Sequence, residues 1–242
     1  MSTKNLLLFG ITLIDEIMRE FRDPGGFVSF SYKNLYGFVP PTYKRKNLYG
    51  MVNNLKISGK VLSTMRGSFK ITEKGKRDIL VNFPNLQFLH KPWDGKWRIV
   101  GFDIEEKKRS LRNALRRSLY MLGFGMLQES LYVSPLPIEN TVEKILSSNR
   151  NEIDNAYIFV SDKFFLGNAG DFVNRAFHIT DLNNAYGELL TKLVLEKEGE
   201  GKLLQEFIKV SVLDPFLPKE LLPKDFVREK LWREFRERRI IR

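Results

Sequence analysis

The feature that most limits the fold of this chain is an apolar stripe in the segment from residue 43 to residue 57. Its members follow the i, i+3, i+4, i+7 spacing of one helix face: Leu48, Met51, Val52 and Leu55. Thr42 precedes the segment as a candidate N-cap, and Gly59 follows it where a left-handed terminator is favoured. The sequence therefore predicts a helix over residues 43–57 with one buried face.

Two helices are predicted before this one. Residues 4–22 carry apolar side chains at helical spacing, and an Asp-Pro-Gly-Gly turn at residues 23–26 ends them. Ser31 can cap a second, short helix that runs through Tyr36 and ends before Gly37.

Two short β-prone runs follow the third helix, at residues 61–64 and 69–72, with Gly67 between them. This spacing predicts a hairpin, and residues 73–80 return to a helical pattern. Helix, short helix, helix and hairpin is the element order of a winged helix-turn-helix. We predict that fold for residues 1–92.

The positive charge of the chain is concentrated in the same region. The whole chain has a formal net charge of +11. Residues 1–92 hold 15 Lys and Arg against 6 Asp and Glu, whereas residues 93–242 hold 25 against 23. Residues 24–72 contain eight basic side chains and no acidic one. A field of one sign attracts a polyanion, so this distribution favours nucleic acid or an anionic membrane as the partner.

The third predicted helix carries donors on the side opposite its apolar stripe. Lys46 and Asn53 lie there, and Lys and Asn are side chains that hydrogen-bond guanine and adenine edges in the major groove. Basic residues on the hairpin would contact phosphate or the minor groove, as a wing does. The alternative to DNA binding is that these basic side chains form an ordinary solvated surface. The predicted DNA-binding residues are Tyr43, Lys44, Arg45, Lys46, Asn47, Gly50, Asn53, Arg66 and Lys70.

The rest of the chain has a different pattern, which begins after a linker-like segment at residues 90–95. Strands alternate with helices and then give way to helices alone, which indicates a layered α-and-β arrangement. The predicted strands cover residues 97–103, 126–133 and 156–160. The predicted helices cover residues 110–122, 139–146, 181–195, 202–213 and 224–239.

Three blocks of the sequence resemble the PaaX family, repressors of phenylacetate-degradation genes. The blocks are residues 43–62 with 71–77, residues 97–105 with 123–135, and residues 214–223. The resemblance implies an α+β chain that binds double-stranded DNA as a homodimer and is released by an acyl-CoA-type effector such as phenylacetyl-CoA. It also implies three domains: the winged helix-turn-helix (1–92), a ferredoxin-like dimerisation domain (93–180) and a helical C-terminal domain (181–242).

The middle block also resembles the ferredoxin-like nuclease subunit of CRISPR adaptation, which implies an alternative function. That subunit carries an aspartate at the end of its first strand, where Asp103 lies, and two such carboxylates across a dimer axis can hold Mg²⁺ for phosphodiester hydrolysis. Asp103 can instead cap the following helix, and no motif supplies a second carboxylate. We therefore predict a regulator without catalytic or metal-binding residues, and not a metal-dependent nuclease.

The composition of the chain excludes several kinds of catalytic and metal-binding site. The chain has no cysteine and only two histidines, His90 and His178, so thiol catalysis and cysteine- or histidine-rich metal sites are excluded. We expect no cofactor. No stretch approaches the ~20 apolar residues of a membrane span, and the N-terminal apolar run is interrupted by Asp15 and Glu16 without a cleavage site. The expected location is the cytoplasm, with no membrane partner.

Overall fold

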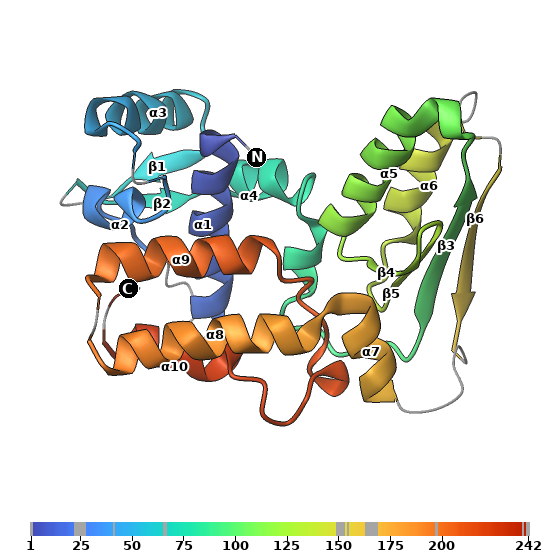
Figure 1. The fold of residues 1–242 in the computed structure, drawn as a ribbon. Helices are drawn as coiled ribbons and strands as arrows, with labels where there is room; N and C mark the ends of the chain where they lie inside the picture. The colour runs from blue at the N-terminus through green and yellow to red at the C-terminus, as the bar shows by residue number, and fades with distance from the viewer. Residues whose placement is uncertain are drawn as a thin grey trace. The chain divides into compact units, whose positions relative to one another are not determined.

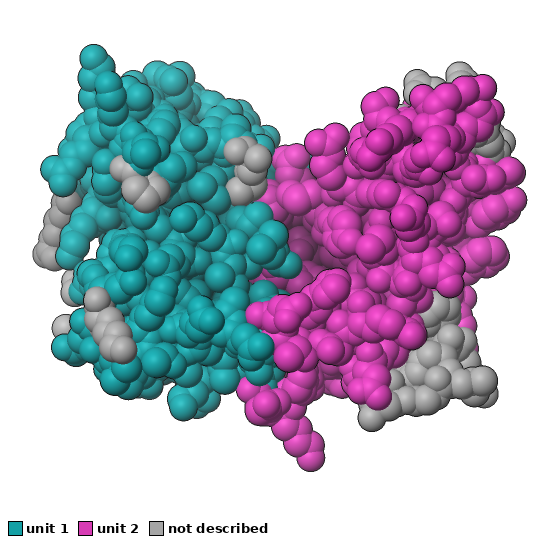
Figure 2. Space-filling view, viewed as in Figure 1, with its two compact units in different colours: residues 1–81, 182–213, 226–242 teal, residues 82–181, 214–225 magenta. Residues whose placement is uncertain are grey.

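The computed structural model describes residues 2–21, 28–40, 42–64, 67–148, 153, 155–162, 169–196, 198–238 and 240. Contacts within the fold divide the chain into two compact units (Figure 2). Unit 1 comprises residues 1–81, 182–213 and 226–242, and unit 2 comprises residues 82–181 and 214–225. Helices and two β-sheets occur in the same chain, so the predicted α+β class is confirmed. The division into three domains at residues 92 and 180 stays a prediction.

The first helix of unit 1 is a core helix. α1 covers Thr3–Ile17 and continues as the 3₁₀ helix η1 (Met18–Phe21), so the helix predicted to residue 22 tightens in its last turn. The Ser2 hydroxyl caps it by accepting a hydrogen bond from the Asn5 N–H (3.3 Å). Its side chains are buried almost all round, as in a helix enclosed by a core. The turn predicted at residues 23–26 lies outside the described residues.

The second helix is short and strongly capped, as predicted. α2 covers Tyr32–Tyr36, and Ser31 forms a capping box with Asn34. α3 covers Arg45–Ile57 and begins two residues later than predicted, with Lys44 instead of Thr42 at the N-cap.

A turn between α2 and α3 explains the later start. The Tyr43 N–H donates to the Pro40 carbonyl (2.8 Å), and the Tyr36 hydroxyl donates to the Tyr43 carbonyl (2.7 Å). These bonds hold Tyr43 outside the helix. The C-terminal end follows the prediction. Gly59 has φ +69°, and the Gly59 and Lys60 N–H groups donate back to Lys56 and Leu55 in a Schellman pattern.

The predicted hairpin is present after α3 (Figure 1). β1 (Val61–Ser63) pairs antiparallel with β2 (Phe69–Ile71), and Phe30 adds an isolated bridge to Phe69. Met65 and Arg66 lie outside the described residues. α4 (Glu73–Leu80) begins at the Thr72 cap, as the helical pattern of residues 73–80 predicts.

Three C-terminal helices complete unit 1: α8 (Ile179–Val194), α9 (Glu200–Val212) and α10 (Arg228–Glu237). α9 is fixed to the segment after α2, because Gln205 Nε2 donates to the Val39 carbonyl (3.1 Å). Phe207 of α9 packs against Phe235 of α10, with ring centroids 5.1 Å apart. The C-terminal helices therefore share a core with the N-terminal segment.

Unit 2 is built on a four-stranded antiparallel sheet. Its elements run β3 (Trp97–Asp103), α5 (Arg109–Met121), β4 (Gly125–Gln128), β5 (Leu131–Ser134), α6 (Glu139–Ser148) and β6 (Asn155–Ser161). The strand order in the sheet is β4-β5-β3-β6. The ferredoxin-like fold requires two strands around the strand-like run at residues 126–133, and the sequence does not separate them. In the structure they are β4 and β5, joined by a tight turn, with a register shift between Met126 and Gln128. Further pieces are η3 (Pro84–Phe88), η4 (Glu106–Lys108), α7 (Ala169–Phe177) and η5 (Lys219–Leu221).

The two faces of this sheet differ. Helices α5 and α6 cover one face (Figure 1), where Val100 and Tyr132 of the sheet join Leu119 and Val142 of the helices in one buried cluster. On the other face, α7 covers part of β4. Tyr157 and Phe159 of β6 lie opposite Gly101 and Ile99 of β3. They stay 54% and 57% exposed.

Candidate nucleic-acid interface

The apolar stripe of α3 is buried as the spacing predicts. Leu48, Val52 and Leu55 are each at most 2% exposed, and Met51 is half-buried. Burial of these side chains fixes which side of α3 faces solvent.

The opposite side presents Lys46, Gly50 and Asn53 of the predicted DNA-binding residues, and all three are exposed. Lys44, Arg45 and Asn47, at the start of the helix, are exposed too, and Arg45 extends toward Tyr36 of α2. Tyr43 is half-buried, and its hydroxyl donates to Met51 Sδ (3.9 Å), so it positions the start of α3. Lys70 is half-buried on β2, and Arg66 lies outside the described residues.

The cations at the start of α3 are not neutralised within the protein. Lys44, Arg45 and Lys46 form no ion pair with any carboxylate in the part of the chain that the structure describes. The lysines next to the hairpin behave differently. Lys60 pairs with Asp78, and Lys76 pairs with Asp15 and Glu16.

These ion pairs shift the pKa values of the residues that form them. The hydrogen bond with Lys60 lowers the pKa of Asp78, and the same bond raises the pKa of Lys60. Burial alone would lower the pKa of Lys76, but Asp15 and Glu16 outweigh it, so the net shift is upward. Among the described residues, Lys44, Arg45 and Lys46 thus form a group of three neighbouring cations without an ion pair at the start of α3.

The amino end of α3 is also open. Its N-cap residue Lys44 makes no side-chain cap bond, so the first N–H groups of the helix have no side-chain acceptor there. Such an end, with its positive dipole, favours a phosphate group.

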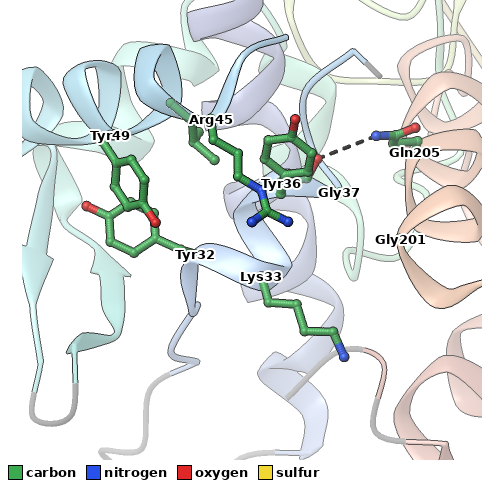
Figure 3. Close-up of a pocket in the computed structure, with 9 residues that line it drawn as sticks. Tyr32, Lys33, Tyr36, Gly37, Arg45, Tyr49, Gly201 and Gln205 are labelled. Atoms are coloured by element: carbon green, nitrogen blue, oxygen red, sulfur yellow. Dashed lines mark hydrogen bonds between the residues drawn. The ribbon is translucent and has the colours of Figure 1, made fainter. Parts of the chain in front are cut away.

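A cavity that the sequence did not reveal lies beside this end of α3, within unit 1 (Figure 3). We call it the tyrosine cavity. Its volume is about 330 Å³, and α2, α3 and α9 supply its walls. Its principal lining residues are Tyr32, Tyr36, Arg45, Leu48, Tyr49 and Gln205. The i, i+4 spacing of Tyr32 and Tyr36 was the one signal in the sequence, because Gln205 is distant along the chain.

Asp103, the residue of the nuclease alternative, ends β3 opposite Asn155 and is exposed. The prediction that it caps the next helix is wrong. Glu105 precedes η4 and Lys108 precedes α5, and neither has a side-chain cap bond. Among the described residues no group of three His, Cys, Asp or Glu side chains is placed to hold a metal ion.

Two of the four arginines of α5 are paired with glutamates. Arg112 contacts Glu106 (3.4 Å), and Arg116 donates to the Glu129 carbonyl (2.8 Å) and carboxylate (3.1 Å). This helix therefore offers less free charge than α3. None of the helices in the described ranges has the length and apolarity needed to cross a membrane.

Comparison with known proteins identifies the middle of the chain. Residues 90–171 match the family described as PaaX protein central Cas2-like domain. This part of the chain is similar to the PaaX central domain. The match agrees with the resemblance found in residues 97–105 and 123–135.

The fold as a whole also has a counterpart. The chain is similar to an uncharacterized protein from Mycobacterium tuberculosis, with 15% sequence identity and a TM-score of 0.55, over 92% of this chain and 90% of that one. That likeness concerns the fold alone. No curated protein matches the sequence.

Proposed function

We propose that this PaaX-like chain is a sequence-specific DNA-binding repressor without catalytic activity. The observation that carries the proposal is the first turn of α3, where three exposed cations without described acidic partners lie above a buried apolar stripe. An anchored helix with free donors on its outer side is what binding in the major groove requires.

In this proposal residues 1–92 form a winged helix-turn-helix. α3 is the recognition helix, and Asn47 and Asn53 supply amide groups that can bridge adenine edges. The β1–β2 hairpin is the wing, and Lys70 on it would contact phosphate. The open amino end of α3 would accept a backbone phosphate.

We assign residues 93–180 to a ferredoxin-like dimerisation domain and residues 181–242 to a helical C-terminal domain. The β-α-β-β-α-β element order with strand order β4-β5-β3-β6 supports the first assignment. The exposed Tyr157 and Phe159 side chains supply an apolar surface suited to self-association, and their rings lie nearly parallel, 6.2 Å apart. We propose that the homodimer binds double-stranded DNA, and that an acyl-CoA-type effector releases it.

Selection of bound sequences from a random duplex pool tests this proposal. A consensus of two related half-sites supports it, and recovery without any consensus would overturn it. Two variants then separate sequence-specific contacts with bases from electrostatic contacts with phosphate. Asn47→Ala should relax the base preference at specific positions. Lys70→Ala should weaken binding to all sequences alike.

A further inference from the structure

The tyrosine cavity combines aromatic walls with one free cation. The rings of Tyr32 and Tyr49 lie 4.4 Å apart on one side of it. The Arg45 guanidinium lies over the Tyr36 ring, 5.7 Å from its centroid, on the other side. Figure 3 shows the Arg45 side chain extending from α3 toward α2, between these two aromatic groups. An aromatic lining with one charged group is the composition of a small-molecule site.

The charges around the cavity leave Arg45 available for a ligand. Lys33, the other cation in the lining, is already paired with Glu200 (3.2 Å). Arg45 has no carboxylate partner within the described ranges of the chain. A ligand that enters the cavity therefore meets one uncompensated positive charge, so a single anionic group is favoured.

The cavity is built from fixed parts. The Tyr36 hydroxyl is held by the Tyr43 carbonyl (2.7 Å), and Gln205 Nε2 donates to the Val39 carbonyl and to the Tyr36 carbonyl (3.1 and 3.5 Å). At Gly37, the C-cap of α2, a Cβ atom would lie 2.6 Å from Leu204 Cδ2, so the end of α2 packs directly against a side chain of α9. A pre-formed site loses little free energy to ordering when it binds.

We infer that the tyrosine cavity binds a planar aromatic carboxylate, and that its occupancy withdraws Arg45 from DNA. The ring of the ligand would pack against Tyr32, Tyr36 and Tyr49 over Leu48. Its carboxylate would pair with the Arg45 guanidinium, whose two-pronged donor geometry matches a carboxylate. Burial and the neighbouring Tyr49 raise the pKa of Tyr32, which keeps that hydroxyl protonated as a donor.

The volume limits the ligand to a small acid. About 330 Å³ lies at the lower end of the roughly 300–1,000 Å³ range of small-molecule pockets. A thioester of the same acid has lost its carboxylate, so the charge at Arg45 favours the free acid over its coenzyme A ester. The tyrosine cavity is therefore a different site from the one that would bind the acyl-CoA-type effector of the proposed function. Only the coupling to DNA rests on the proposed function; the binding step stands without it.

Isothermal titration of the full-length protein with 2-naphthoate tests the binding step. We expect saturable binding at one site for each chain. Decahydro-2-naphthoate keeps the charge but lacks the aromatic rings, and 2-naphthalenemethanol keeps the rings but lacks the charge. Both should bind at least roughly tenfold more weakly. Equal binding of all three compounds, or of none, would overturn the inference.

Variants locate the site. Arg45→Gln should weaken 2-naphthoate binding by roughly ten- to one-hundred-fold, and Tyr49→Leu should also weaken it. Lys209→Gln is the matched control, because Lys209 is an exposed cation of α9 that does not line the cavity. Circular dichroism melts check that each variant is folded. Binding unchanged in Arg45→Gln, or weakened equally in Lys209→Gln, would place the acid elsewhere and refute the site.

The regulatory step has its own readout. Titration of the protein–DNA complex with 2-naphthoate should lower the DNA affinity, and the reciprocal experiment should show DNA lowering 2-naphthoate affinity by the same factor. 2-Naphthoyl-coenzyme A should act more weakly than the free acid if the carboxylate is recognised. A protein that binds the acid but no DNA would refute the proposed function and leave the cavity assignment standing. A protein that binds DNA but no acid would refute the cavity assignment and leave the proposed function standing.

Discussion

Replacing Lys44, Arg45 and Lys46 together by alanine should change how DNA affinity depends on salt. Every cation that neutralises a phosphate releases condensed counterions, so the slope of log K against log salt is about −0.9 per contact. The three side chains are exposed and have no acidic partner among the described residues, so each is free to contact a phosphate.

The magnitude follows from this count. Three lost contacts make the slope shallower by about 2.7 for one protomer and by about 5 for a homodimer. Between 50 mM and 200 mM salt, the affinity advantage of the unmodified protein over the triple variant should shrink on the order of a thousandfold for the dimer. The free energy of unfolding should change by only about 0.5 kcal/mol per site or less, because these are surface positions.

Fluorescence anisotropy with one labelled duplex, repeated over a salt series, measures both slopes. The control is a second triple variant, in which the exposed cations Lys209, Lys230 and Arg233 of α9 and α10 become alanine. It removes the same net charge from unit 1 but should shift the slope by less than about one unit. Equal slope changes in the two variants would show that α3 binds no phosphate and that only the overall charge matters.

Three further predictions test other parts of the molecule. Replacing Tyr157 and Phe159 by lysine should convert the dimer to a monomer in light scattering. For the dimer, inserting half a helical turn (about 5 bp) between the half-sites should reduce DNA affinity more than inserting a whole turn, and this difference should disappear in the variant. If the variant is still a dimer, the interface lies elsewhere. Mg²⁺ or Mn²⁺ should support no cleavage of DNA or RNA, and cleavage lost in Asp103→Ala would instead establish a nuclease. Arg98 lowers the pKa of Asp94 by a direct hydrogen bond. The pair therefore stabilises the fold above the usual Asp pKa, and this stabilisation is lost as the pH falls. From pH 6 to pH 3 the melting temperature should fall less in Arg98→Met than in the unmodified protein.

Helices with a repeated apolar spacing were predictable from sequence, but their exact starts were not. The stripe of α3 and the Gly59 terminator depend on neighbours within one or two helical turns, and both are confirmed. The start of α3 depends on the hydrogen bond from Tyr36 to the Tyr43 carbonyl, which competes with capping by Thr42. Local propensity for an N-cap says nothing about such a bond.

The strand pair of the middle sheet shows a second limit. Residues 126–133 lack the glycine, proline or asparagine that usually signals a hairpin turn. The ferredoxin-like fold requires two strands around this run, and the sequence did not show where to separate β4 from β5. The turn at Glu129 and Ser130 becomes evident only from strand pairing, in which Gln128 lies opposite Leu131. Period-two hydrophobic patterns indicate which face of a strand is buried, but they do not show where a strand without turn residues reverses.

The tyrosine cavity shows the third limit, because its walls come from segments far apart in the chain. Tyr36 and Gln205 are joined by a hydrogen bond across 169 positions, and one sequence contains no signal for that pairing. The joining of α9 to α2 has a functional consequence in this protein. It places a segment from the C-terminal third of the chain in the lining of the same cavity as Arg45, one of the residues proposed to contact DNA. A ligand bound there would interact with the proposed recognition helix directly, so regulation in unit 1 requires no signal from residues 90–171, the part of the chain that is similar to a PaaX central domain.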